Sequence, residues 1–471
     1  LQLLMPSEKL FMARDNRIQM FPHEWRASTT LSGVYALRML GMFLVLPVLA
    51  IYAASLPGAE DNKTLVGLAM GIYGLTQALL QLPLGIASDK FGRKKTIYVG
   101  LVVFAAGSFL AAAADTLPML VAARAIQGAG AVSAAVTALL ADLTRDGVRT
   151  RAMAMIGLSI GLTFSVSLVV APMIADVAGV RGLFMLTGIL TAISIGVVAW
   201  MTPDPEVSKL HEDTQAQPSR IGEVLKNRRL LTLDFGIFAL HAAQMALFTA
   251  LPFAMTRLGL EKIQHWKVYL PSTITGLVVM VPLIIVGETR NKLKQVFVLG
   301  IVCIAAAQLG LLSGMHSIWL ITAYLVVYFI GFNVLEASLP SMVSKIAPSD
   351  LKGTAMGVYN TMQSLGLFAG GAAGGLLFQK CGFAGVFAFC SILMLLWLVI
   401  AVLSPAPKPV KNLSYPVGGV WQGNRDGLQR ALLQLEGVED IGFSFDGQTV
   451  YLKVLQKGFD QAAAEKIITG V

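Results

Sequence analysis

Residues 85–95 have the sequence GIASDKFGRKK, and they separate the second and third apolar stretches of the chain. Gly85 lets a neighbouring helix approach closely, and Gly92 permits a tight turn that a side chain would hinder. Asp89 lies where the preceding stretch ends, so its carboxylate can pair with Arg93 or meet the positive N-terminus of another helix. A loop that only holds positive charge on one side of the membrane would need the Lys and Arg residues but not the Gly and Asp residues. The intervals of Gly, Asp, Gly and Arg therefore favour a structured loop.

The composition places the apolar stretches in a lipid bilayer. Of the 471 residues, 55% are apolar and 13% are charged, whereas a soluble domain carries about 25% charged residues. This excludes an ordinary soluble enzyme, a disordered chain and a nucleic-acid binder. The three cysteines, Cys303, Cys381 and Cys390, form no CxxC pair and no cluster with histidine. We therefore expect no disulfide framework, no metal site and no cofactor.

Twelve apolar segments are long enough to cross a bilayer, which requires roughly 20 residues each. They lie at about 30–56, 64–87, 95–114, 118–141, 152–175, 181–201, 230–256, 268–287, 295–313, 318–344, 353–378 and 384–403. The expected domains are an N-terminal cytoplasmic segment (1–29), an N-terminal six-helix bundle (30–201), a cytoplasmic linker (202–229), a C-terminal six-helix bundle (230–403), a second linker (404–414) and a small cytoplasmic domain (415–471).

The positive charges in the connections predict the orientation of the chain. Seventeen Lys and Arg residues lie in the connections on one side of the membrane, and six lie on the other. Because cytoplasmic loops carry the excess of Lys and Arg, we expect both termini, the middle connection and the tail in the cytoplasm. The net charge of +9 then follows largely from topology rather than from an acidic partner.

The two groups of six segments echo each other at a spacing of about 200 residues. Duplicated halves of this kind place a substrate site between them, near the middle of the membrane. We therefore expect an all-α membrane protein with two pseudo-symmetric six-helix bundles. The positions that share the spacing are Gly85 and Gly287, Ala152-Met153 and Ala355-Met356, and Pro172 and Gly371.

Several of these segments resemble motifs of the major facilitator superfamily. Residues 85–95 are similar to its signature loop, and Arg124-Ala125-Ile126-Gln127-Gly128 resembles the motif of its proton-coupled members. Residues 171–175 resemble the drug-antiporter motif, although Ala171 stands where glycine is usual and the closing glycine pair is missing. Residues 370–375 echo the same motif in the eleventh segment, with glycine in place of proline.

The resemblance covers residues 30–403 and, together with the tail domain, is greatest to the YajR-type branch of proton-driven exporters. It implies the twelve-helix fold of the superfamily and a transporter, not an enzyme, in the bacterial inner membrane. The partners that it implies are a small-molecule substrate, protons and membrane lipids, with no nucleic acid and no cofactor. We expect a monomer.

The resemblance also implies roles for five residues that we call the latch: Gly85, Asp89, Gly92 and Arg93 of the loop, and Asp142. Asp89 would engage the N-terminus of the eleventh segment, near Gly353-Thr354, in the outward-facing state. Arg93 would complete a charge relay with Asp142, which ends the fourth segment. Protonation or a changed membrane field would loosen this contact.

Five ionisable residues fall inside the segments: Arg38, Arg124, Asp234, His241 and Glu336. Each such side chain costs at least ~2.5–3.5 kcal/mol at the centre of a span, so it needs a partner or a watery cavity. A carboxyl in a low-dielectric cavity keeps its proton more readily than in water, and imidazole titrates near neutral pH. We therefore take Glu336 as the leading proton carrier, with Asp234 and His241 as further candidates.

Structural interpretations of the same residues stay open at this point. Asp234 lies a few residues from the cytoplasmic end and can extend to the headgroups. His241 can be a neutral, hydrogen-bonded packing residue, and Glu336 can belong to a structural pair. Arg124 keeps its proton, so it would tune a nearby acid or polarise Gln127.

Small and polar residues of the segments are expected to line the cavity or to pack helices closely. In the fourth and fifth segments they are Gln127, Gly128 and Pro172, and in the eleventh they are Gly370, Gly371, Gly374 and Gly375. Glycine in these places allows two helix backbones to approach each other.

The polar segments outside the membrane have their own patterns. Residues 220–230 suit either a short surface helix or a solvated linker, and Ser404 to Pro409 form a stiff, proline-rich linker. The tail predicts a small α+β ferredoxin-like domain with a regulatory or assembly role, or with none. Its expected elements are a strand near 415–421, a helix at 424–436, a hairpin of 438–445 and 449–455 with an Asp446-Gly447 turn, and a helix at 459–469.

These observations favour a proton-coupled antiporter that exports small amphipathic molecules by alternating access. Two alternatives remain: a proton-coupled importer of a small metabolite, which the altered motif of the fifth segment leaves open, and a non-transporting sensor that signals through the tail. Tail deletion separates the last from the others, because transport should survive the deletion and sensing should not.

Overall fold

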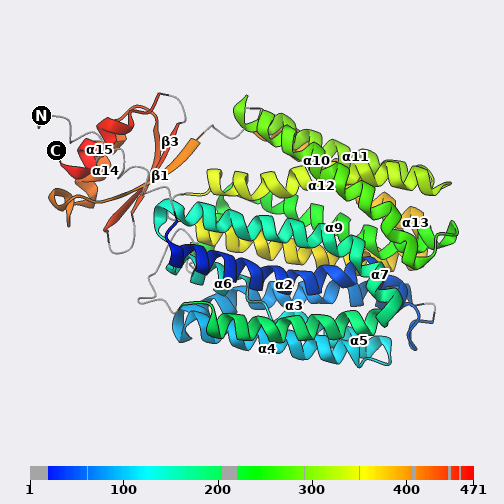
Figure 1. Ribbon diagram of the computed structural model, residues 1–471. Helices are drawn as coiled ribbons and strands as arrows, with labels where there is room; N and C mark the ends of the chain where they lie inside the picture. Colours follow the sequence, from blue (N-terminus) through cyan, green and yellow to red (C-terminus); the bar gives the residue numbers. More distant parts are fainter. Residues whose placement is uncertain are drawn as a thin grey trace, which may run out of the picture.

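The computed structural model describes residues 20–60, 62–203, 220–290, 292–348, 351–405, 410–443, 447–455 and 458–470. They form a long helical bundle with a small α/β domain at one end (Figure 1). We call that end the tail side and the opposite end the far end. Most of the expected N-terminal cytoplasmic segment (1–29), most of the middle connection and Asp446 of the expected hairpin turn lie outside the described residues.

Ten apolar helices in the described part of the chain are long enough to cross a membrane, counting α5 and α6 as one. The first bundle contains α2 (Pro22–Ala53), α3 (Lys63–Phe91), α4 (Arg93–Ala112), α5 (Leu117–Ala129), α6 (Ser133–Asp142) and α7 (Asp146–Trp200). The second contains α9 (Arg228–Arg257), η2 (Lys262–His265), α10 (Trp266–Thr289), α11 (Leu293–Ser313), α12 (Ile318–Ile346) and α13 (Lys352–Leu403), and the short α8 (Ile221–Lys226) precedes it.

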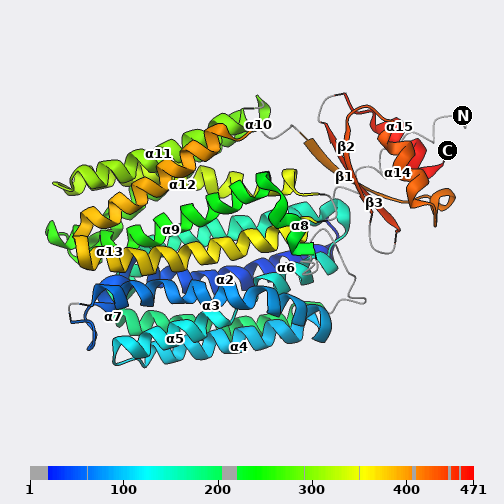
Figure 2. The ribbon, with the colours of Figure 1, turned by 180° about the vertical axis from the view of Figure 1, so that it is seen from behind.

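The helices α7 and α13 each contain two predicted segments. A straight helix of 55 residues would measure ~80 Å, far more than the ~30 Å hydrocarbon core. Gly179 in α7 and Gly382 in α13 have φ angles of 68° and 60°, which glycine adopts readily, and the chain reverses there. Figure 2 shows the two arms of α13, yellow and orange, returning from the same far end. Ten helices thus account for the twelve predicted segments.

Two predicted segments differ in detail from the observed helices. The fourth is broken into α5 and α6 at Gly130, where an added β-carbon would lie 2.5 Å from the carbonyl oxygen of Gly100. The first begins at Pro22 rather than near residue 30, because the backbone N–H of Phe21 donates to Glu24 at 2.7 Å and starts a polar first turn. A count of apolar residues does not detect such a turn.

The segment after the middle connection forms α8, which packs against the second bundle through the buried Val224. Arg220 donates to Glu223 at 2.9 Å and lowers the pKa of that carboxyl. Asn227 then accepts from the backbone N–H of Arg229 at 3.0 Å and starts α9. Of the two interpretations of this segment, the described residues favour the short helix.

The tail domain has the predicted order β-α-β-β-α: β1 (Val410–Pro416), α14 (Arg425–Leu433), β2 (Val438–Phe443), β3 (Thr449–Leu455) and α15 (Gln461–Thr469). Its antiparallel sheet has the order β1-β3-β2, and Leu428, Leu452 and Ile468 belong to its core. The first strand was expected near 415–421 and lies earlier. Beyond Pro416 the chain instead forms the 3-10 turn η3 (Gly419–Trp421), and Trp421 donates to the carbonyl of Ile467 at 2.6 Å.

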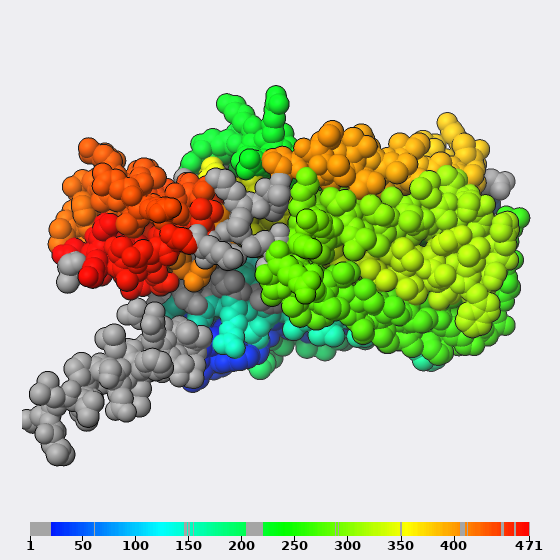
Figure 3. Space-filling model, turned by 90° about the horizontal axis from the view of Figure 1, so that it is seen from above, coloured from blue at the N-terminus to red at the C-terminus, as the bar shows by residue number. Residues whose placement is uncertain are grey.

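The tail domain projects from the tail side of the bundle, as the orange and red atoms at the left of Figure 3 show. The ammonium group of Lys453, on β3, donates to the carbonyl of Ala347 at the end of α12. A cavity of about 380 Å³ lies beside this contact. Its lining includes Arg229 and Lys345 from the bundle and Glu439 and Asp440 from β2. Charged side chains of both parts therefore meet at this junction.

Candidate functional site

The two bundles touch most closely along the far half of α3 and α13. A β-carbon on Gly371 would lie 2.7 Å from the Cα atom of Gly71 and 2.6 Å from the carbonyl oxygen of Gly67. One on Gly375 would lie 2.7 Å from the Cα atom of Gly67. Real β-carbons essentially never approach other atoms so closely, so the two backbones are in direct contact here. We call this contact the glycine seal.

Polar contacts extend the glycine seal to the far end. The backbone N–H of Thr64 donates to the side-chain oxygen of Gln379 at 3.0 Å. The ammonium group of Lys63 lies 5.0 Å from the ring centroid of Phe253, a cation–π contact between the bundles. The tail-side half of α3 differs, because Pro83, Ile86, Asp89 and Lys90 are exposed there. The described bundles are therefore joined at the far end.

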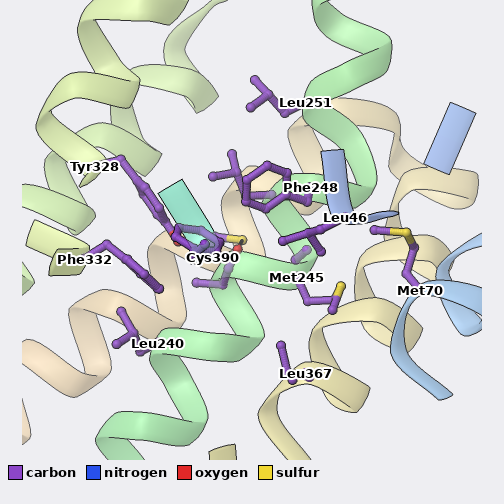
Figure 4. Packing of buried hydrophobic residues seen from close by; sticks show 14 of the residues in the cluster. Leu46, Met70, Leu240, Met245, Phe248, Leu251, Tyr328, Phe332, Leu367 and Cys390 are labelled. Carbon is purple, nitrogen blue, oxygen red and sulfur yellow. Dashed lines mark hydrogen bonds between the residues drawn. The ribbon is translucent and has the colours of Figure 1, made fainter. Parts of the chain in front are cut away.

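Four aromatic rings fill the middle of the interface between the two bundles. The ring of Phe164, on α7, lies 5.0 Å from that of Phe43, 6.2 Å from that of Phe329 and 5.6 Å from that of Phe332. Two of these rings come from each bundle. Figure 4 shows Phe332 and Tyr328 on α12, with side chains of α2, α3, α9 and α13 beside them. We call the four phenylalanines the aromatic layer.

Glu336 and His241 meet directly on the tail side of the aromatic layer. The Nε2 atom of His241 lies 3.8 Å from Oε2 of Glu336, and the ring of His241 lies 6.1 Å from that of Phe332. Gln363 joins them from α13: its Nε2 atom lies 2.8 Å from Nε2 of His241 and 3.4 Å from Oε1 of Glu336. The structure thus brings together three polar side chains from α9, α12 and α13.

Glu336 points into the protein rather than toward lipid. Its partner His241 belongs to α9, the most deeply enclosed of the described membrane helices, in which 89% of the most apolar stretch is buried. Glu336 still keeps 36% of its side-chain surface accessible. Glu336 follows Phe332 by one helical turn toward the tail side, and its Oε2 atom is buried without a hydrogen-bond partner among the described residues.

Asp234 shares α9 with His241 but not its contacts. The carboxyl is buried, and its Oδ2 atom has no hydrogen-bond partner among the described residues. It therefore does not extend to the surface, which was the structural interpretation of this residue. Tyr359 on α13 lies within electrostatic reach of both Asp234 and Glu336, and its hydroxyl is likewise unpartnered in the described part of the chain.

The two arginines lie apart from the acids, within the first bundle, and both contact Tyr73. Arg38 donates to the Tyr73 hydroxyl at 3.0 Å and to Ser133 at 3.1 Å. Arg124 lies 5.0 Å from the Tyr73 ring centroid and donates to Gln127. Salt bridges to a carboxylate are absent for both among the described residues. Arg124 thus has the expected contact with Gln127, but no acid beside it.

The latch residues come together as a chain of charges at the tail side. Arg93 donates to Asp89, to Ser88 at 3.2 Å and to Asp142 at 3.1 Å. The side chains of Arg93 and Asp142 are 3% and 0% exposed, whereas that of Asp89 is 30% exposed. Gly92 has a φ angle of 102° and separates α3 from α4. Arg93 is the partner that the structure gives Asp89, and the expected contact with Gly353-Thr354 is not formed in this conformation.

The predicted packing residues divide between two surfaces. On α13, Gly371 and Gly375 form the glycine seal, whereas Gly370 and Gly374 face Ala242 and Ala246 of α9 in the same bundle.

The other predicted packing residues lie in the first bundle. Gln127 donates to Ser108 at 2.8 Å, and an added β-carbon on Gly128 would meet the backbone of Tyr73. Pro172 and Pro47 line a cavity of about 190 Å³ at the far end, together with Lys262 and His265 of the second bundle.

Sequence reasoning missed Gln363 and Tyr73. Both are neutral, and neither the insertion cost of charges nor the resemblance identifies them. Asn360 and Gln363 are two amide side chains about one helical turn apart in an apolar segment. This pair of polar residues is the signal that could have identified Gln363. Within the described residues, no group of three or more His, Cys, Asp or Glu side chains is arranged to hold a metal ion.

Comparisons with known proteins agree with this geometry. The family model described as the Major Facilitator Superfamily matches residues 31–371 and 291–434. The chain is 40% identical to "Inner membrane transport protein YajR" of Escherichia coli over 96% of this chain and 99% of that protein. It is 25% identical to "Quinolone resistance protein NorA" of Staphylococcus aureus, over 72% and 87%. The solved structure of the human organic anion transporter MFSD10 (TETRAN) matches 81% of this chain and 100% of its own, with a TM-score of 0.61 and 19% identity.

Proposed function

Because this chain belongs to the major facilitator superfamily, it is a multi-pass inner-membrane transporter of a small molecule and not an enzyme, and we propose that it is a proton-coupled antiporter. In this proposal it exports small amphipathic molecules by alternating access. The two bundles rock about the aromatic layer, and the described conformation is closed at the far end.

The Glu336–His241 pair is the single observation that carries the proton coupling. The pair brings together two groups that bind protons, 3.8 Å apart, in the middle of the bundle. It lies on the tail side of the aromatic layer, and in this proposal protons reach it from the tail side while the far end is closed. A proton-binding site that is open to one side and sealed from the other is what a rocking antiporter requires.

The surroundings of the pair support an amphipathic substrate. Phe332 and Phe329 lie one and two turns away from Glu336 on the same helix and are buried in the aromatic layer in this conformation. A molecule with an apolar body and a polar group would pack on these rings and reach the carboxylate once the bundles move apart there. Substrate and proton would then compete for Glu336, and this competition would produce exchange.

The tail side corresponds to the cytoplasm in this proposal. The excess of Lys and Arg lies in the connections at that side, as the positive-inside rule requires of cytoplasmic loops. The far end then faces outward, and the described conformation loads substrate from the cytoplasm. The relative NorA, named for quinolone resistance, supports export at 25% identity.

The latch would stabilise the opposite conformation. In the described state Asp89 is partly exposed and paired with Arg93. When the bundles close at the tail side, Asp89 would reach the N-terminus of α13, where the helix dipole favours a negative charge. The second bundle has Glu288 in the corresponding loop and no aspartate, so the latch acts on one side of the interface.

Dissipation of a pH gradient in proteoliposomes tests the proposal. Purified protein is reconstituted with an acidic lumen, and candidate compounds are added outside while luminal pH is followed. An exporter that exchanges protons for substrate makes the lumen more alkaline with some compounds of the panel. An importer that moves protons and substrate together would carry protons inward with the added compound and make the lumen more acidic. The sign of the pH change therefore separates the two.

A further inference from the structure

Gln363 occupies the space between the two titratable groups of the proton site. It lies on α13, whereas His241 lies on α9 and Glu336 on α12. Its Nε2 atom is 2.8 Å from Nε2 of His241 and 3.4 Å from Oε1 of Glu336. The amide therefore contacts both groups with the same nitrogen, which carries two N–H donors.

The hydrogen bonds fix the protonation state that this arrangement fits. The Nδ1 atom of His241 lies 3.2 Å from the carbonyl oxygen of Ile237, and a carbonyl can only accept, so Nδ1 carries a proton. A neutral ring then has a lone pair on Nε2, which accepts one N–H of Gln363. The second N–H is left for Oε1 of Glu336. The described contacts thus fit a neutral imidazole, and the N–H donated to Oε1 favours the ionised form of Glu336, whose Oε2 atom has no hydrogen-bond partner among the described residues.

We propose that Gln363 is a positioning residue of the proton site, which holds His241 neutral and lowers the proton affinity of Glu336. A proton on Nε2 of His241 would turn that atom into a donor, and the amide would have to rotate to offer its oxygen. A proton on Oε1 of Glu336 would remove the second acceptor. Either event breaks a contact that Gln363 makes now.

The position of Gln363 also connects the proton site to the glycine seal. The next residue, Ser364, contributes its backbone to the contact with Gly74 on α3. Leu367, one turn further, also packs against Gly74. The turn of α13 that carries the amide therefore belongs to the interface between the bundles. This inference rests on the proposed function, because it takes Glu336 as the proton carrier.

Other titratable groups face the same space. Tyr328 on α12 and Tyr359 on α13 lie within electrostatic reach of Glu336. Asp234 on α9 lies near Tyr359 and has no hydrogen bond to the amide among the described residues. From the first bundle, the aromatic ring of Phe164 reaches this region. Gln363 is the group that hydrogen-bonds both members of the pair, so its removal should act on them and not on Asp234.

The test is the pH dependence of carbodiimide labelling, which needs no substrate. Dicyclohexylcarbodiimide reacts with protonated carboxyl groups in apolar surroundings, and peptide mass spectrometry separates Glu336 from Asp234. The full chain in detergent is labelled between pH 5 and pH 9 as wild type, as Gln363→Met and as Gln363→Asn. Methionine keeps the length of the side chain without donors, and asparagine keeps the amide but is one methylene shorter. Gln308→Met is the matched control, since Gln308 is buried and lies on α11.

Loss of an N–H donor disfavours the carboxylate, so more Glu336 is protonated at each pH. We expect the midpoint of Glu336 labelling to move up by about half a pH unit or more in both Gln363 variants, a roughly threefold or larger change in proton affinity. Labelling of Asp234 should stay unchanged, and so should the Gln308→Met curve. Coinciding Glu336 curves in wild type and both Gln363 variants would overturn this inference alone. Labelling of wild-type Glu336 that does not vary with pH would overturn the proton site itself and the inference with it.

Discussion

Gly71 and Gly371 lie in backbone contact across the two bundles. A β-carbon on Gly371 would be only 2.7 Å from the Cα atom of Gly71. Closure of the far end therefore requires that these positions carry no side chain. Because α3 and α13 belong to different bundles, the contact forms only when the bundles approach each other at this end, and it must open when the transporter faces outward.

Replacement of Gly371 by alanine should shift the transporter toward the conformation that is open at the far end. Overpacking a tight contact costs about 1–3 kcal/mol, and this cost falls only on the closed state, so the ratio of open to closed molecules should rise about fivefold or more. The measurement is the distance between spin labels at Ala113→Cys and Lys380→Cys, two exposed positions at the far end of different bundles, in a chain whose Cys303, Cys381 and Cys390 are replaced by serine.

Gly374→Ala is the matched control for this experiment. Gly374 lies on the same helix and is also crowded, but it faces Ala246 within its own bundle. Its replacement should lower the melting temperature without changing the distance between the labels. Equal distance distributions for Gly371→Ala and wild type would show that the glycine seal does not control opening.

The two carboxylates of the latch should differ strongly in their effect on stability. Asp142 is fully buried beside Arg93, and removing one partner of a buried pair costs about 3–5 kcal/mol. Asp89 is partly exposed, and such a pair contributes only about 0.2–1 kcal/mol. Asp142→Asn should therefore lower the melting temperature far more than Asp89→Asn.

Asp89→Asn should act on conformation instead. If Asp89 engages α13 when the tail side closes, its neutral replacement weakens that state and increases the population that is open to the tail side. The same pair of spin labels reports this as a shorter distance at the far end. A longer distance, or an unchanged one, would count against the latch.

The contact of Lys453 with the end of α12 should hold the tail domain on the bundle. A hydrogen bond with a charged donor contributes about 1.5–3 kcal/mol, so Lys453→Met should increase the detached fraction roughly tenfold or more. Cleavage of the linker 404–409 by a proline-specific endoprotease measures that fraction. Lys411→Met, on the exposed part of β1, should leave the cleavage rate unchanged. Equal cleavage rates for the two variants would show that the contact does not hold the domain.

The helical architecture is predictable because it depends on local composition. Twelve apolar stretches with short connections leave few possible arrangements of the helices. The two halves of the sequence also repeat each other, which predicts two similar bundles. The reversals at Gly179 and Gly382 fall in the short gaps predicted between the fifth and sixth and between the eleventh and twelfth segments. The break between α5 and α6 could not be deduced from the sequence, since glycine can continue an apolar helix or end it.

The side-chain partners are less predictable, because they depend on how each helix is rotated. The charges of His241 and Glu336 make both residues conspicuous, and the structure places them together. The role of Gly371 differs from that of Gly370 only because one residue on a helix turns the side-chain direction by about 100°. Gln363 contacts the pair through a neutral amide, and neither its charge nor its spacing indicates that place.

The central claim is that proton occupancy of Glu336 biases which end of the transporter is open. It is tested most directly by the distance between labels at Ala113→Cys and Lys380→Cys as a function of pH, in the wild type and in Glu336→Gln. Antiport requires that the proton-loaded protein return to the conformation that is open to the tail side. The account predicts that acidification shortens the far-end distance in the wild type, and that Glu336→Gln shows the short distance at every pH. A wild-type distance that does not change with pH, or a Glu336→Gln variant that responds to pH as the wild type does, would contradict it.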